Sequence, residues 1–245
     1  MHNLDRFDAR AVTWFLRLYG LALVVDVATE IAAGVWHVHT GTFYPWRHLG
    51  IVPLYPASVL AIEWTLRAGA GLALLAGARR VRVVSAAVRV AALVLFVAVL
   101  ERYSNHGVLL FLVAFFLTIA PPDVTSPGFD AREHPALGLV RAQLVIVYAF
   151  SGINKVAHGF WSGRSLVHLL GSALTPGAGT ALSVVVIASE LAIPLLLVRR
   201  ARVGMAVVVA MHAAFALLVP GVISFGVAMT ALALLFVDRP RARAL

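Results

Sequence analysis

Cysteine is absent from this 245-residue chain, and charged residues make up only 13% of it. Without cysteine the protein can form no disulfide, carries no thiolate nucleophile and offers no thiolate to a metal. A soluble domain has roughly a quarter charged residues. Together with 61% hydrophobic residues and a mean hydropathy of +0.93, the scarcity of charge predicts an integral membrane protein with one domain over residues 1–245.

Several sequence motifs are also missing. The chain has no Walker loop, no GxGxxG after a strand and no GxSxG elbow, so nucleotide binding and serine hydrolysis have no support. The N-terminal residues carry acids among their arginines and no clear small-residue cleavage site follows, so we expect no cleaved signal peptide. The formal charge of +9 lies in short basic runs between apolar stretches, which does not predict a nucleic-acid partner.

Apolar segments of about membrane-spanning length dominate the chain. A helix needs roughly 20 apolar residues to cross a bilayer. Segments near this length predict an all-α polytopic bundle of about eight transmembrane helices, at approximately 16–36, 55–78, 83–101, 106–121, 137–156, 180–198, 203–220 and 222–237.

The arginines then predict an orientation in the cell membrane. With eight crossings and a cytoplasmic N-terminus, the C-terminus is cytoplasmic too, and the outer side keeps only Arg47, Arg102, Lys155 and Arg164. Cytoplasmic loops of membrane proteins are enriched in basic residues. The cytoplasmic side collects fifteen: Arg6, Arg10, Arg17, Arg79, Arg80, Arg82, Arg89, Arg132, Arg141, Arg199, Arg200, Arg202, Arg239, Arg241 and Arg243.

In this topology, ionisable residues of different helices come to a similar depth near the outer face. Lipid offers charged groups no partner, so they must face the bundle interior or one another. A polar pocket open to the outside is the simplest consequence. The residues concerned are Asp26, Glu30, Glu63, Arg67, His106 and Lys155.

Each of these residues also has a purely structural interpretation. Glu63 and Arg67, one helical turn apart, can neutralise each other. Asp26 and Glu30 can hold an arginine or cap a neighbouring helix, and Lys155 can extend to the outer interface.

The remaining polar residues of the apolar segments have structural interpretations as well. His106 follows Asn105, which can cap a helix. Glu190 and His212 can hydrogen-bond across the bundle. The three histidines of the outer loop, His37, His39 and His48, lie among aromatic residues typical of a membrane interface, and we predict no metal site there.

Two stretches resemble a known family. ERYSNHGVLLFLVAFFLTIAP (101–121) and RAQLVIVYAFSGINKVAHGFWSG (141–163) resemble segments of vitamin K-dependent γ-glutamyl carboxylase and of the related bacterial horizontally transferred transmembrane (HTTM) domain proteins. A weaker match runs from Ser189 to Phe215. The matching positions of the second stretch are Gln143, Ile146, Val147, Tyr148, Phe150, Ser151, Gly152, Lys155, Trp161 and Gly163.

The resemblance implies a quinol-dependent enzyme. In the carboxylases the matching lysine is held to deprotonate reduced vitamin K, which then reacts with oxygen to give a strong base. By this resemblance Lys155 is the candidate base, with Asn105 and His106 as its neighbours.

The same resemblance implies residues that bind the cofactor. We expect Tyr148, Trp161, Glu63 and Arg67 to contact a reduced quinone of the vitamin K or menaquinol type. The carboxylases carry a large soluble lumenal region, and the outer loops expected here, about 37–54 and 157–179, are too short to form one.

Three functional hypotheses follow. The first is an outward-facing, carboxylase- or epoxidase-like enzyme that uses a lipid quinol and acts on a peptide or protein. The second is a non-catalytic membrane partner for peptide export, maturation or complex assembly, because stand-alone HTTM relatives include members linked to the export or maturation of small toxin peptides. The third is a small transporter, although no inverted repeat is evident.

Overall fold

The computed structural model describes residues 7, 9–34, 57–77, 83–88, 105–119, 135–171, 174–218 and 222–237. Over these ranges every regular element is helical, which confirms the predicted all-α class. Residues 83–88 are helical as well. The elements are α1 (Ala9–Ala32), α3 (Ala57–Leu75), α5 (Asn105–Ile119), α6 (Pro135–Ala157), the 3-10 helix η2 (Phe160–Ser162), α7 (Arg164–Leu170), α8 (Pro176–Arg199), α9 (Ala201–Leu218) and α10 (Ile223–Val237).

Four of the described helices are long and apolar enough to cross a membrane, so the chain is a membrane protein. They cover Arg10–Ala32, Pro135–Ala157, Pro176–Arg199 and Ala201–Leu218. Two shorter apolar helices, Leu109–Thr118 and Ile223–Val237, coincide with the fourth and eighth predicted segments.

Some sequence predictions fall partly or wholly outside the described residues. Most of the third segment, 83–101, does, and so does the loop that contains His37, His39 and His48. The stretch 157–179, expected as an outer loop, contains η2 and α7.

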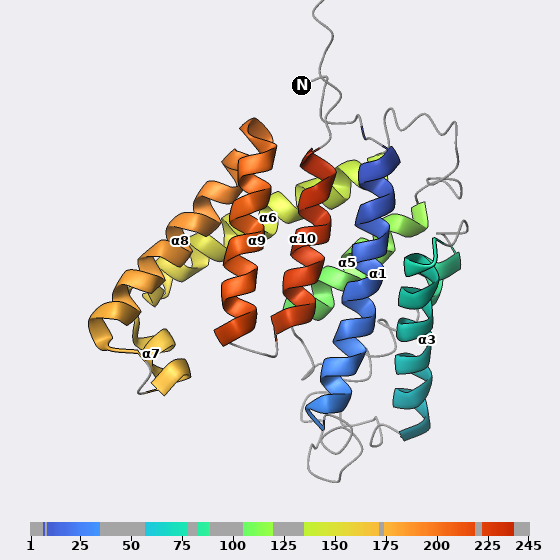
Figure 1. Cartoon of the computed structure of the whole chain (residues 1–245), viewed down its shortest axis with the longest axis horizontal. Helices are drawn as coiled ribbons and strands as arrows, with labels where there is room; N and C mark the ends of the chain where they lie inside the picture. Colours follow the sequence, from blue (N-terminus) through green and yellow to red (C-terminus); the bar gives the residue numbers. More distant parts are fainter. Residues whose placement is uncertain are drawn as a thin grey trace, which may run out of the picture.

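The helices form a bundle in which α10 is central. α10 packs against α1 on one side and α9 on the other, and α6 and α8 pack against each other. Figure 1 shows α1, α9 and α10 roughly side by side, with α6 running obliquely across them and α3 and α8 at opposite sides of the bundle. The core contains large, fully buried side chains of α1, α6 and α10, among them Phe15, Tyr19, Leu144 and Phe236.

The first helix begins earlier than the sequence predicts, at Ala9 rather than near residue 16. The first turns of α1 contain polar residues, so the sequence shows no long apolar run there. One face of these turns is nevertheless apolar, and its Val12 and Phe15 are fully buried. Deeper in the bundle, the Tyr19 hydroxyl donates to the Leu110 carbonyl oxygen at 2.8 Å and ties α1 to α5. Burial of Val12 and Phe15 stabilises the start of the helix, and the hydrogen-bonded Tyr19 holds its middle against α5.

A glycine contact sets the distance between α1 and α3. A Cβ atom built on Gly71 would lie 2.6 Å from the Gly20 carbonyl oxygen, so the two backbones touch there. Small residues allow this approach in membrane bundles. Since the helices run antiparallel, the turns beyond Gly20 lie beside the turns before Gly71, which places Asp26 and Glu30 next to Arg67.

Candidate functional site

Lys155 lies in the last turn of α6, on a face that points toward α8. Ser151 precedes it by one helical turn, and residues four apart share a face of a helix. The Lys155 Nζ atom lies 2.7 and 2.8 Å from the two carboxylate oxygens of Glu190 on α8, and 2.6 Å from the Ser151 Oγ atom. The Ser151 hydroxyl also donates to Glu190 at 3.1 Å. Three polar groups from two helices therefore form one closed cluster, here called the Lys155–Glu190 site.

The Lys155–Glu190 site is only partly shielded. The Lys155 side chain keeps 24% of its exposure, whereas the Glu190 side chain keeps 8%. The ring of Phe160, in η2, has its centroid 5.7 Å from Nζ, within cation–π range. The amine thus faces the surface while the carboxylate lies behind it. Such a pair offers a proton donor and a proton acceptor at the same place.

One turn deeper on α6, Tyr148 makes a second cross-bundle contact. Its hydroxyl is 2.8 Å from the Nε2 atom of His212 on α9, and both residues are buried. The His212 ring packs edge-on against Phe225 of α10, with centroids 5.3 Å apart. This pair joins three helices inside the apolar core.

A second charged cluster joins α1, α3 and α10. The Arg67 guanidinium contacts Asp26, lies 2.7 Å from Glu30 and 2.9 Å from Glu63, and is almost fully buried. The cluster continues through Trp64, whose Nε1 donates to Glu30 at 2.6 Å. On the other side, the hydroxyl of Ser224 in α10 donates to Asp26 at 2.8 Å. A guanidinium can bind several carboxylate oxygens at once because its donors form a planar fork.

These contacts decide between several interpretations of the sequence. The Glu63–Arg67 pair is confirmed, and Asp26 and Glu30 hold that arginine rather than cap a helix. Glu190 and His212 do hydrogen-bond across the bundle, but both partners lie on α6.

The predicted site residues fall into separate places. Lys155 is in the site above, Tyr148 is buried against His212, and Trp161 is 56% exposed. Glu63 and Arg67 belong to the second charged cluster, on α3 at the other side of the bundle (Figure 1). Asn105 and His106 open α5, and their side chains lie outside the described part of the structure.

Glu190 is a functional candidate, although the sequence predicted only a structural role for it. A signal for its role was available, since it is the only acidic residue between positions 134 and 237. Lys155 is the only lysine in the same stretch. An ammonium and a carboxylate in apolar helices are expected to form an ion pair, because burying either charge alone is costly.

No protein-family model matches the chain, and neither a curated protein nor a solved structure shows significant similarity to it. The resemblance to HTTM proteins therefore stays a prediction from the quoted motifs.

Proposed function

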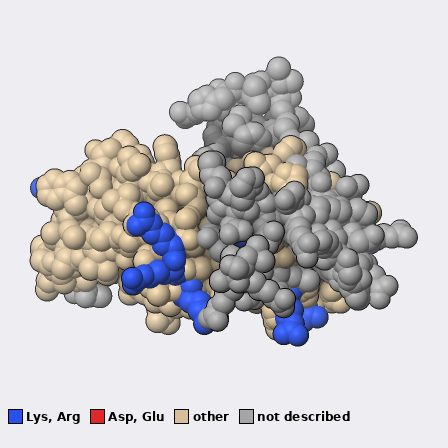
Figure 2. All heavy atoms as spheres, turned by 90° about the horizontal axis from the view of Figure 1, so that it is seen from above, with Lys and Arg blue, Asp and Glu red and all other residues tan. Residues whose placement is uncertain are grey.

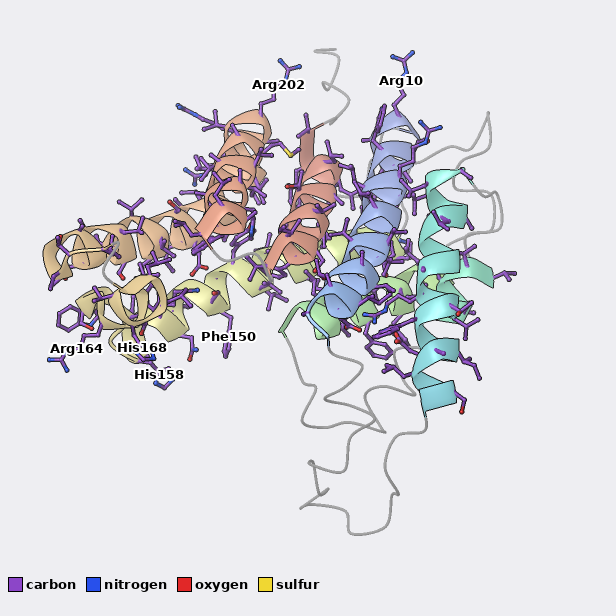
Figure 3. All side chains as sticks on the ribbon, turned by 60° about the horizontal axis from the view of Figure 1, so that its bottom comes forward. Arg10, Phe150, His158, Arg164, His168 and Arg202 are labelled. Atoms are coloured by element: carbon purple, nitrogen blue, oxygen red, sulfur yellow. The ribbon has the colours of Figure 1, made fainter. Side chains whose placement is uncertain are left out.

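We propose that the protein is a multi-pass HTTM-type protein of the cell membrane, with about eight spans and both termini in the cytoplasm. The arrangement of exposed arginines supports this topology. Arg10 and Arg202 lie at the same end of the bundle, at the starts of α1 and α9 (Figure 3). Seen from that end, the described charged side chains in view are all basic (Figure 2). Arg164 and His158, which follows Lys155 by three residues, lie at the opposite end (Figure 3).

The function that the geometry supports best is binding of a lipid quinol headgroup at the Lys155–Glu190 site, with proton transfer from a phenolic hydroxyl. The observation that carries the proposal is the contact of Nζ with both oxygens of the Glu190 carboxylate inside predominantly apolar helices. A functional charge in a membrane span is expected to face a partner, a cavity or a substrate path.

The residues around the site fit such a ligand. A phenol hydroxyl donates and accepts one hydrogen bond each, and the ammonium and carboxylate supply the two complementary roles. Phe150 and Ile153, on the α6 turns that carry Ser151 and Lys155, are 69% and 60% exposed and offer apolar surface for an isoprenoid tail. When bound, a reduced quinone would supply the reaction with oxygen and the strong base that follows it.

Within this proposal each residue has a distinct task. Lys155 orients the hydroxyl and exchanges a proton with it, and Glu190 accepts that proton through the contact with the amine. Ser151 holds both groups in register. A peptide or protein at the outer face is the proposed substrate, and proton abstraction or carboxylation-like chemistry is the proposed reaction.

Turnover tests the enzymatic proposal directly. The purified protein in lipid nanodiscs is supplied with menaquinol or vitamin K hydroquinone and oxygen, and quinol oxidation is followed. We expect oxidation above that of empty nanodiscs, and its loss in Lys155→Ala and Glu190→Gln. Arg202→Gln, an exposed residue at the other end, is the matched control. Oxidation equal to that of empty nanodiscs, in folded wild-type protein, would exclude the enzyme.

A second candidate function is a non-catalytic partner that assists the maturation or assembly of a peptide or protein complex. The closure of the Lys155–Glu190 site on itself favours it, because Ser151 and Glu190 already satisfy the ammonium. Under this alternative, all variants that fold leave quinol oxidation at background, and Lys155→Ala affects only stability or partner retention.

A further inference from the structure

The connection between α6 and α8 contains two short helices that pack on the bundle. Residues 159–170, here called the 159–170 segment, comprise η2 and α7 and pack on the start of α8. Gly163 has φ of 75° and comes so close to α8 that a Cβ atom there would lie 2.3 Å from the Thr180 nitrogen. The Thr180 hydroxyl donates to the Ser162 carbonyl oxygen at 3.0 Å. The segment is thus fixed to the end of the bundle.

The outward side of this segment combines apolar and basic side chains. Trp161 and Leu169 are each 56% exposed, and Arg164 and His168 are exposed one helical turn apart on α7. His158, at the end of α6, is exposed beside them, and Figure 3 shows all three basic side chains gathered at this end of the molecule. Leu166, on the inner side of α7, is buried.

Along the sequence, the charge around this segment has one sign. The chain contains no aspartate or glutamate between residues 134 and 189, and the next acid, Glu190, binds Lys155. An exposed arginine next to exposed tryptophan and leucine complements a phosphate that is attached to acyl chains. Tryptophan favours the membrane interface, and helices with apolar and basic faces lie in that interface.

From this arrangement we propose that the 159–170 segment binds the headgroup of an anionic phospholipid in the outer leaflet. The Arg164 guanidinium pairs with the phosphate, His168 supplies a second hydrogen bond, and Trp161 and Leu169 rest at the acyl boundary. The proposal uses the topology given above, but it does not require quinol chemistry at Lys155.

The absence of cysteine makes this surface directly testable. Ser165→Cys introduces one exposed thiol on α7, which carries an environment-sensitive fluorophore. The full chain is placed in nanodiscs of phosphatidylcholine with increasing phosphatidylglycerol. We expect a saturable spectral change with phosphatidylglycerol that weakens as salt rises. Arg164→Gln should weaken the apparent affinity about fivefold, in keeping with the contribution of one basic residue at an anionic surface.

Controls separate this site from general attraction to charged lipid. Arg202→Gln, read by the same reporter, should leave the titration unchanged, and Arg164→Lys should keep most of the affinity. Identical titrations for Arg164→Gln and the parent protein would overturn the proposal, as would an equal response to inorganic phosphate alone. Arg164→Gln should leave quinol oxidation unchanged, so failure of the lipid proposal is distinguishable from failure of the proposed enzyme.

Discussion

At the scale of single residues, the bundle handles its buried charges in two ways. Lys155 meets one carboxylate near the surface, whereas Arg67 meets three deep between α1 and α3. Breaking a buried pair by removing one partner is costlier than never having formed it, because the other charge stays behind without compensation. The two sites therefore differ in how much stability depends on them.

The Lys155–Glu190 contact predicts coupled stability effects. Lys155→Met and Glu190→Gln should each destabilise the protein, and the double variant should be less destabilised than the sum, with a coupling of about 1–2 kcal/mol. A double-mutant cycle of unfolding free energies in mixed micelles measures this coupling. Additive effects would show that the two groups do not interact in the folded protein.

Arg67 should be much less tolerant of substitution. Arg67→Met leaves Asp26, Glu30 and Glu63 around an apolar side chain, and we expect a loss of roughly 3–5 kcal/mol of unfolding free energy. Arg67→Lys should recover only part of it, since an ammonium lacks the planar fork. The measurement is thermal unfolding of purified protein, with exposed Arg202→Gln as control. A melting temperature of Arg67→Met near that of the parent would contradict the role of the cluster.

Sequence reasoning at this scale found the charged residues but not all their partners. Glu63 and Arg67 were predictable as a pair because they are one turn apart on the same helix. The pairing of Lys155 with Glu190 joins positions 35 residues apart, and it depends on how α6 crosses α8. The Tyr148–His212 contact, across 64 residues, depends on the same packing. Helix periodicity carries no information about such crossings.

At the scale of elements, glycine contacts decide where helices approach. The Gly20–Gly71 contact brings α1 and α3 together and so positions the carboxylates around Arg67. The lengths of the apolar runs predicted most of the described long helices at about the right positions. Their boundaries were harder to predict, because the polar first turn of α1 and the short helices between α6 and α8 do not show as long apolar runs.

The glycine contact predicts a sharp contrast between two neighbouring positions. Gly71→Ala should destabilise the protein by about 1–3 kcal/mol, because the added methyl group meets the Gly20 backbone. Gly69→Ala, on the same helix, meets nothing within 4 Å and should be neutral or stabilising by about 0.5–1 kcal/mol. Unfolding midpoints of the two variants provide the comparison. Equal midpoints would mean that α1 and α3 do not touch at Gly71.

At the scale of the whole molecule, the charge distribution gives the bundle two different ends. One end carries exposed Arg10 and Arg202. The other carries the 159–170 segment with exposed Arg164, and the Lys155–Glu190 site lies against that segment through Phe160. At the first end, buried Arg141 of α6 connects neighbouring parts of the bundle. Its Nε donates to the Leu235 carbonyl oxygen at 2.8 Å, and its guanidinium stacks on Phe7, so the chain start, α6 and α10 meet there.

This polarity predicts opposite labelling of two single cysteines. In intact cells, Ser165→Cys should react with a membrane-impermeant maleimide, and Val203→Cys at the start of α9 should react only after the membrane is permeabilised. Both positions are exposed in the structure, so burial does not explain a difference. The reverse pattern would invert the topology and place the Lys155–Glu190 site on the cytoplasmic side.

Equilibrium binding is the sharpest test of whether the Lys155–Glu190 site binds a quinol headgroup. Purified protein in nanodiscs is titrated anaerobically with a reduced menaquinone, and the affinity is compared among the parent protein, Lys155→Ala, Glu190→Gln and Arg202→Gln. We predict saturable binding in the parent and Arg202→Gln, and at least about tenfold weaker binding in the other two, equivalent to the loss of one charge-assisted hydrogen bond. Equal affinity in all four folded proteins, or no saturable binding in the parent, would contradict the claim.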